Sequence, residues 1–455
     1  MRRVRRHKGV TLLACMIFLV VFMALGASLA AMSGTNVQLS ANQRRAASAL
    51  AGAESGVEVI RYWLGHVMMD ATTPPADYLA TIIDQIQLDL QASGAANMIL
   101  ASDGFLQPVS LGSASGRSFS ALLSMNAANP SILDVTVTGT CEAMERTVRV
   151  GFNIAPYEHP IFKYGLAAKG PIQFPNNPTT TSITSNWEAD LYTESSGSLI
   201  AVHVGGNANF DGDITIGNPG AMVDFAGDVQ IAGDSGQAAI DNHVTIGAPP
   251  VEFPAADTSR FLPYATGPTV DPNTMDLTKG LTLTNATIPA GMNPVFDGTV
   301  IVEGVLIVEQ PNIVTFNRNV ELRGIMVGEN GTYNGSGNQI NIAGNFASLP
   351  LPSDSQFDAL RQEEGSSIIV PDFDVSFTGN YSAIEGVVAA GTLHFSGNAS
   401  AVVKGSLISF ADSPTVVEGN VSLTFDRANS TNIPAGFDTK RVLAFNPTTY
   451  ETVVN

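Results

Sequence analysis

The chain has 455 residues, of which 44 % are hydrophobic and only 14 % charged, and 43 are glycine. This composition argues against intrinsic disorder, which needs low hydrophobicity and high charge, and it is typical of short strands joined by tight turns. Five of the 22 Lys+Arg lie within the first eight residues, so the remaining 17 face 41 Asp+Glu and give the rest of the chain a net charge of −24. Such an acidic surface repels phosphate backbones, and we expect no nucleic-acid partner.

The two cysteines, Cys15 and Cys141, are far apart in sequence, and the first lies within an apolar segment. We therefore expect no intramolecular disulfide. An exported chain of this kind has to be held together by its own hydrophobic core.

The N-terminus carries the strongest signal. No charged residue occurs between Gly9 and Gln43, and Val10–Met32 is a run of 23 apolar or small residues. A helix of about 20 apolar residues spans a bilayer, and the five preceding cations should remain on the cytoplasmic side. We therefore predict a single-pass anchor in the cytoplasmic membrane, with the bulk of the chain on the periplasmic or outer side. The residues assigned to the membrane helix are Val10, Leu13, Ile17, Val21 and Leu25.

Four interpretations of this segment compete. A cleaved secretory signal would use Ser28-Leu29-Ala30 as its processing site, although the apolar run is longer than the usual 7–15 residues. Leu12-Leu13-Ala14-Cys15 has the pattern of a lipobox, but the apolar run continues past the cysteine. The third interpretation is an unprocessed signal anchor.

The fourth interpretation explains more residues. The segment Lys8-Gly9-Val10-Thr11-Leu12-Leu13 resembles the leader of type IV prepilins. This resemblance implies that prepilin peptidase cuts between Gly9 and Val10 and leaves the apolar helix on the mature chain. Most major pilins have Glu at the fifth mature position, where this chain has Ala14. PilX-like minor pilins and the K-type minor pseudopilins of type II secretion also lack that Glu, which favours a tip, initiating or accessory subunit.

The resemblance to PilX-like N-terminal regions continues at Ala53-Glu54-Ser55-Gly56-Val57-Glu58. The same stretch carries an apolar stripe at helical spacing, which predicts a helix from Val10 to Leu64 that is about 80 Å long. The outer half of this helix needs a surface on which to bury the stripe. The stripe consists of Ala46, Leu50, Ala53, Val57, Ile60 and Leu64.

A small pilin-like module is predicted next. Thr72-Thr73-Pro74-Pro75 separates the long helix from a second helix at Tyr78–Leu90. Ile132–Ile154 alternates apolar and polar residues and predicts a β-hairpin. We assign residues 1–9 to the leader, 10–65 to the long helix and 66–155 to a small α+β module.

The remainder of the chain is repetitive. Phe296–Gly304 and Phe316–Gly324 have the same pattern twenty residues apart, and Phe225–Gly233, Phe377–Gly386 and Phe395–Gly405 are variants of it. A period near 20 with strand–turn–strand content favours a β-solenoid (parallel β-helix) over a sandwich. We assign residues 156–430 to this domain and 431–455 to a C-terminal tail. Phe253–Gly280 should form a surface excursion, and Leu349–Glu364 a second interruption. The predicted fold class is mainly β.

Few residues suggest chemistry. The six histidines show no i, i+4 or His-x-His spacing, so neither a metal nor a cofactor is expected. Asp211-Gly212-Asp213 and Asp224, Asp228 and Asp234 could offer oxygen ligands to Ca²⁺, but tight turns explain them better. Carbohydrate-active β-helix enzymes use grooves of Asp, Arg and Lys, whereas this region offers only Arg318, Arg323 and Lys404. We therefore expect no enzyme, and an enzyme ranks third among the functions.

The leading hypothesis is a minor pilin or pseudopilin-like structural subunit of a type IV pilus or type II secretion-type filament. Its expected partners are other pilin-like subunits, the inner membrane and prepilin peptidase, and its solenoid would serve in adhesion or as a spacer. The alternative is an unprocessed membrane-anchored surface protein whose solenoid binds an envelope polymer or self-associates.

Overall fold

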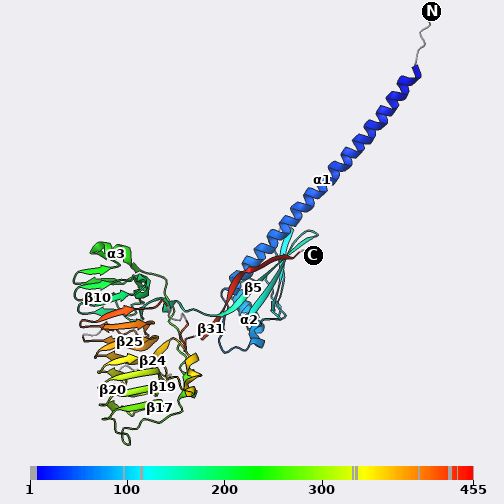
Figure 1. Cartoon of the computed structure of the whole chain (residues 1–455). Coiled ribbons are helices and arrows are strands. Elements are labelled where there is room, and N and C mark those ends of the chain that lie inside the picture. Colours follow the sequence, from blue (N-terminus) through cyan, green and yellow to red (C-terminus); the bar gives the residue numbers. More distant parts are fainter. Residues whose placement is uncertain are drawn as a thin grey trace, which may run out of the picture. The chain divides into compact units, whose positions relative to one another are not determined.

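The computed structural model divides the chain into two compact units. The first comprises residues 1–155 and 440–455, and the second comprises residues 156–439. Each unit is described by itself (Figure 1). The structure describes residues 8–95, 98–112, 116–329, 331, 333, 337–397, 400–428, 433–437 and 439–453.

The first unit begins with one continuous helix, α1, from Lys8 to Leu64 (57 residues). The apolar stripe predicted along its second half is confirmed, since Ala53, Val57, Ile60 and Leu64 are all less than 5 % exposed. They pack on an antiparallel sheet, where Gly139 lets the two backbones meet. A Cβ at Gly139 would lie only 2.1 Å from the carbonyl oxygen of Ala49.

The sheet of the first unit has the strand order β1-β31-β5-β4-β3-β2. The predicted hairpin is confirmed by the antiparallel pairing of β4 with β5, and the predicted second helix is confirmed as α2 (Tyr78–Ala92), preceded by the 3₁₀ turn η1 (Pro75–Asp77). The strands are β1 (Met68–Asp70), β2 (Phe105–Ser110), β3 (Arg117–Met125), β4 (Ile132–Cys141), β5 (Met144–Pro156) and β31 (Lys440–Val453).

The last strand differs from the prediction of a C-terminal tail over residues 431–455. β31 pairs antiparallel with β1, so that Met68 lies opposite Val442, and it adds Leu443 and Phe445 to the core of the first unit. Local sequence could not show this, because the partner strand lies some 370 residues earlier and is three residues long.

The second unit is a β-solenoid, as predicted. Its strands pair in parallel along three ladders, and the period of twenty is seen directly where β19 and β21 align from Val300↔Val320 to Val308↔Gly328. Five long strands turn a corner and serve two ladders each: β17 (Leu281–Ile288), β19 (Val300–Val308), β21 (Val320–Gly328), β24 (Ser366–Phe377) and β26 (Val387–Phe395).

The shorter strands each belong to one ladder. The first ladder contains β6 (Leu166–Ala168), β9 (Leu191–Thr193), β12 (Ile214–Ile216), β16 (Val244–Ile246) and β28 (Leu407–Ser409). The second contains β7 (Ile172–Phe174), β10 (Ile200–Val204), β13 (Met222–Phe225), β18 (Val295–Phe296), β20 (Asn312–Phe316), β22 (Asn338–Ile342) and β29 (Thr415–Val417). The third contains β8 (Thr179–Ser182), β11 (Ala208–Phe210), β14 (Val229–Ile231), β23 (Phe346–Ser348), β25 (Tyr381–Glu385), β27 (Ser400–Lys404) and β30 (Ser422–Phe425).

Stacked side chains fill the centre of the solenoid. The rings of Phe296 and Phe316 stack at 4.9 Å, and those of Phe377 and Phe395 at 5.0 Å. At the corners, glycine supplies a positive φ, as at Gly324, whose φ is +146°. Close approach is a second reason for glycine, since a Cβ at Gly379 would lie 2.1 Å from the carbonyl oxygen of Gly344.

The order of the coils in space differs from their order in sequence. The first coil, β6–β9, lies in the interior of the stack, because β6, β7 and β8 pair with β28, β29 and β30 on one side. On its other side β7, β8 and β9 pair with β10, β11 and β12. In Figure 1 the orange coils therefore lie between the green coil of β10 and the yellow coils.

Each end of the stack is partly covered. One end carries α3 (Gln237–His243) and the two-residue strand β15 (Asp234–Ser235), which pairs antiparallel with β14. At the other end residues 267–270 hydrogen-bond to the second part of β17. These contacts protect β14 and part of β17 against edge-to-edge addition of another strand.

The two irregular segments also differ from simple surface excursions. Phe261, in η4 (Ser259–Tyr264), and Phe357, in η5 (Ser355–Phe357), are each no more than 1 % exposed. Together with η6 (Leu360–Gln362) and η2 (Pro160–Lys163), these segments cover outward-facing residues of the first ladder, such as Ile307 and Ile369. This ladder is consequently buried on both of its sides.

Candidate functional site: the N-terminal helix and a solenoid groove

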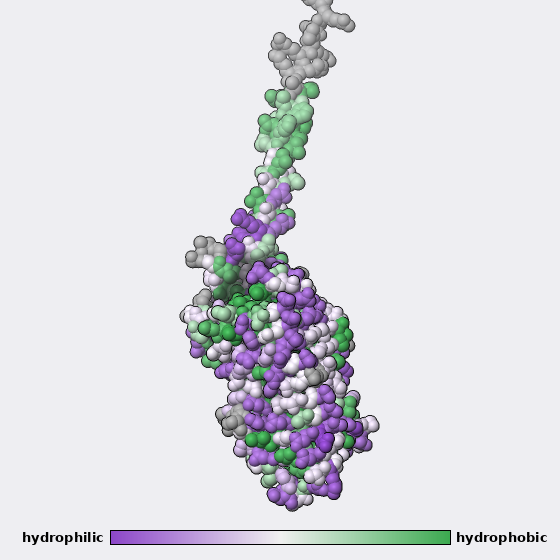
Figure 2. Space-filling model, turned by 90° about the vertical axis from the view of Figure 1, so that its left-hand side faces the viewer, coloured by the Kyte–Doolittle hydropathy of each residue, from purple (hydrophilic) through white to green (hydrophobic). Residues whose placement is uncertain are grey.

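The N-terminal half of α1 is a bare apolar surface. All five residues predicted for the membrane helix are exposed: Val10 (68 %), Leu13 (63 %), Ile17 (56 %), Val21 (47 %) and Leu25 (53 %). Their spacing of three and four residues places them on one face of the helix, and Figure 2 shows hydrophobic residues along this part of it. The helix is long and apolar enough to cross a membrane. The first half of α1 is therefore bare, whereas one face of its second half packs on the sheet.

The predicted processing site lies in the first turn of α1. Lys8, Gly9 and Val10 are helical, and Val10 is exposed. The cations Arg2, Arg3, Arg5 and Arg6, which the prediction places on the cytoplasmic side, fall outside the described residues. Cleavage between Gly9 and Val10 remains a prediction.

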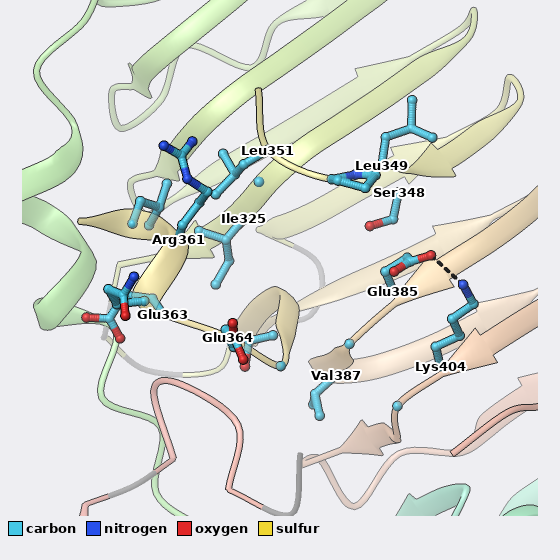
Figure 3. A pocket seen from close by; sticks show the side chains of 18 of the residues that line it. Ile325, Ser348, Leu349, Leu351, Arg361, Glu363, Glu364, Glu385, Val387 and Lys404 are labelled. Atoms are coloured by element: carbon cyan, nitrogen blue, oxygen red, sulfur yellow. Dashed lines mark hydrogen bonds and ion pairs between the residues drawn. The ribbon is translucent and has the colours of Figure 1, made fainter. Parts of the chain in front are cut away.

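A second candidate site is a groove of about 900 Å³ along one edge of the solenoid (Figure 3). Its floor is made by the glycine corners of successive coils, and the segments around Leu349 and Glu363 form its walls. Lys404 Nζ pairs with Glu385 Oε1 at 2.7 Å across adjacent coils. Glu363 is held by Arg260 at 2.6 Å. With these charges already paired, the groove is better suited to holding a ligand than to acid–base chemistry.

Two of the three candidate enzyme residues are engaged in ion pairs. Arg323 is paired with Glu321 at 2.8 Å and with Glu303 at 3.6 Å, and Lys404 is paired as described above. Arg318 is exposed in the turn that precedes β21. The arrangement gives no support to a catalytic constellation around these residues.

Three of the histidines each pair with a carboxylate, and these pairs lie at separate places in the solenoid. His203 Nδ1 lies 2.8 Å from Asp224, His243 Nδ1 lies 2.8 Å from Asp213, and His394 Nε2 lies 3.0 Å from Glu418. Asp234 flanks the other side of His243, and Asp211 accepts from the backbone of Ser182. Within the described part of the chain, no three His, Cys, Asp or Glu side chains are placed to hold a metal ion. Cys15 and Cys141 are both free thiols.

A buried charged cluster marks the seam between the first coil and the last. Arg427, only 4 % exposed, donates to the carbonyl oxygens of Phe162, Lys163 and Glu188 and lies over the ring of Trp187. Burial lowers the pKa of Arg427 to about 10 and raises that of Asp190 to about 6. No sequence pattern indicates this cluster, because Arg427 lies some 240 residues from its partners.

Comparison with known proteins leaves the family open. No protein-family model and no curated protein matches the chain. The competence-associated pilin ComZ from Thermus thermophilus is similar at 14 % identity and a TM-score of 0.28, over 90 % of this chain and 98 % of that one. An ice-binding protein from Shewanella frigidimarina (its DUF3494 domain) is similar at 13 % identity and a TM-score of 0.18, over 60 % of this chain and 98 % of that one. Because both TM-scores are far below 0.5, the fold rests on the strand pairings described above.

Proposed function

We propose that the chain is a minor structural subunit of a type IV pilus or type II secretion-type filament. Prepilin peptidase would cleave it between Gly9 and Val10. Helix α1 would then hold it in the cytoplasmic membrane and pack among the helices of related subunits, while the solenoid is displayed outside. The observation that carries this proposal is α1 itself, whose first half is bare and apolar and whose second half is docked on its own sheet.

The dimensions of the helix support an anchoring role. The 23-residue run from Val10 to Met32 has a rise of about 35 Å, against a hydrocarbon core of about 30 Å. A soluble protein would not leave so much apolar surface uncovered. Lipid before assembly, and neighbouring helices after it, would cover this surface in the proposed role.

An accessory position fits better than a repeating one. Ala14 replaces the Glu that most major pilins carry, as the resemblance of the leader implies. The solenoid ends are partly covered, by β15 on β14 and by residues 267–270 on β17, which favours display as a single module over polymerisation through its strands. Its groove of about 900 Å³ offers a surface for an adhesion target.

Sequencing the N-terminus of the mature protein tests the proposal. A start at Val10, with Gly9→Val blocking the cleavage, would support it. An intact N-terminus would favour the alternative of an unprocessed surface anchor, and a start at Ala31 would indicate a secreted protein without the helix. Turnover of an acidic polysaccharide that is lost in Arg323→Ala would contradict the proposal of a non-enzymatic subunit.

The groove of the solenoid allows a separate test of the alternative function, an anchored surface protein that binds an envelope polymer. If the solenoid binds an envelope polymer, reversing the exposed charge at its rim with Lys404→Glu should weaken retention on purified envelope material. Processing at Gly9 would be unaffected by that substitution.

A further inference from the structure

A groove in the first unit lies between α1 and one end of its sheet, with a volume of about 1030 Å³. One face of the helix forms one wall, with residues at spacings of three and four. The helix residues are Leu29, Met32, Ser33, Asn36, Val37, Ser40, Ala41, Arg44, Arg45 and Ser48. Arg117, at the start of β3, and Cys141 and Glu142, at the end of β4, form the opposite wall.

The groove is positively charged in a chain that is otherwise strongly acidic. Arg44, Arg45 and Arg117 converge on it, and Glu142 is its single acidic lining residue, 2.6 Å from Arg45. Within the described residues the side chains of Arg44 and Arg117 have no acidic partner. Among the described residues, two arginines of the groove are thus available for an anion.

The same helix carries a matching pair of carboxylates. Glu54 and Glu58 are one turn apart and exposed. Each has only a weak partner, since Glu54 accepts from the Tyr450 hydroxyl at 3.3 Å and Glu58 lies 3.7 Å from Arg61. They follow Arg44 by 10 and 14 residues, which corresponds to about 15–21 Å along the helix axis.

We propose that the arginine groove receives Glu54 and Glu58 of a second copy of this chain. The α1 helices of the two copies would run parallel, with the second copy displaced by about 15–21 Å toward the N-terminus of the first. The small side chains of Ser33, Ser40 and Ser48 would allow the helices to approach closely. This inference rests on the proposed lateral packing of α1 and specifies its register.

The register has a consequence for when the contact forms. Two copies anchored in a flat bilayer have their apolar segments at the same level, so their arginines and glutamates cannot meet. The contact becomes available once one copy has been raised by about 15–21 Å relative to the other. It would therefore stabilise a staggered filament in preference to neighbours side by side in the membrane.

A phospholipid headgroup is a poorer occupant. Arg44 lies 12 residues beyond Met32, about 18 Å past the end of the apolar run. The headgroup layer extends only about 5–7 Å beyond the hydrocarbon core. Although helical side chains lean toward the N-terminus, they do not close the remaining distance.

Cysteine cross-linking of the full-length chain in detergent, where no flat bilayer holds the two apolar segments at one level, tests the register. Cys15 and Cys141 are first replaced by Ser, and chains carrying Ser40→Cys are mixed with chains carrying Ala51→Cys, two positions that the 10–14-residue offset brings to the same level. We expect a disulfide-linked dimer whose yield falls as salt is added, because salt screens exposed charges. Arg44→Glu with Arg117→Glu in the Ser40→Cys chain should reduce the yield about tenfold, since like charges would then face each other.

A charge swap provides the matched control. Glu54→Arg with Glu58→Arg in the Ala51→Cys chain should reduce the yield similarly, and mixing the two charge-reversed chains should restore it. Thermal unfolding of each variant verifies that the first unit remains folded. A yield that is insensitive to these charges would overturn the proposal. Native mass spectrometry supplies a second test. The proposal would also be overturned if the original chain retained bound phospholipid and the Arg44→Glu, Arg117→Glu variant lost it. Cleavage after Gly9 should be unchanged in all of these variants. A failure of the proposed register can therefore be distinguished from a failure of the proposed function.

Discussion

The two units are stabilised by different kinds of contact. In the first unit, α1 lies directly on the sheet, where small residues such as Gly139 and Ala53 let the backbones approach, and its ion pairs are at the surface. In the solenoid, apolar ladders supply the regular core. Charged groups that are buried or partly buried include Arg427 and Asp190 at the seam and His243 at the α3 cap. We therefore expect the first unit to respond to side-chain size, and the solenoid to respond to charge and pH.

The largest effect is expected at the seam. Arg427→Met removes three hydrogen bonds to carbonyl oxygens and leaves Glu188 and Asp190 without the nearby positive charge. We expect the free energy of unfolding of the solenoid to fall by about 3–5 kcal/mol, as for loss of one partner in a buried charged cluster. Denaturant titration measures this. Arg318→Met, at an exposed turn of the same unit, should change stability by less than about 0.5 kcal/mol; equal losses for both variants would contradict the role given to Arg427.

The next effect concerns the first unit. Gly139→Val places methyl groups where a Cβ alone would lie 2.1 Å from the carbonyl oxygen of Ala49. Separation of α1 from the sheet should lower the free energy of unfolding of this unit by about 2–3 kcal/mol. This loss of stability is measured as reduced protection of the β4 amides from hydrogen exchange. Gly34→Ala is the control, since a Cβ there meets no atom within 4 Å, and it should cause no loss of protection.

A smaller effect, dependent on pH, is expected from Asp190. Burial raises the pKa of this carboxyl from 3.8 to about 6, so the folded state holds the proton more tightly than the unfolded state. Ionisation therefore costs stability above about pH 6, and the cost vanishes below about pH 4. Because Asp190 is partly exposed, we expect Asp190→Asn to stabilise the solenoid by only about 1 kcal/mol at pH 7. The melting temperature of the Asp190→Asn variant should exceed that of the original chain at pH 7 and equal it at pH 4.

The smallest effect is local to the α3 cap. Hydrogen bonding to Asp213, with Asp234 also close by, raises the pKa of His243 above 6.5. The stabilisation is complete below about pH 6.5 and is lost as the pH rises through the folded-state value. Hydrogen exchange of the α3 amides should therefore show less protection at high pH, and His243→Gln should remove that dependence. A pH effect that persists in the variant would assign it to another group.

The sequence indicates several regular elements, each because a local pattern specifies it. The charge-free run after Lys8 predicts the bare half of α1, alternation predicts the β4–β5 hairpin, and the twenty-residue repeat predicts the parallel coils. It does not indicate which coil follows which in space, since Leu166–Ala168 could pair with any other coil of the same pattern. The return of β31, the seam at Arg427 and the convergence of Arg117 on Arg44 depend on residues far apart in the chain. No local pattern specifies such pairings.

The interior position of the first coil constrains the order of folding. Strands β6–β8 have an open edge until β28–β30 arrive about 240 residues later, and the first unit likewise lacks β31 until the end of the chain. Contacts with such wide sequence separation form slowly. If the chain crosses the membrane as it is synthesised, both units remain unfinished until translocation is nearly over. A premature stop after residue 400 would leave an unpaired strand edge in each unit. We expect such a fragment to aggregate or to be degraded by envelope proteases.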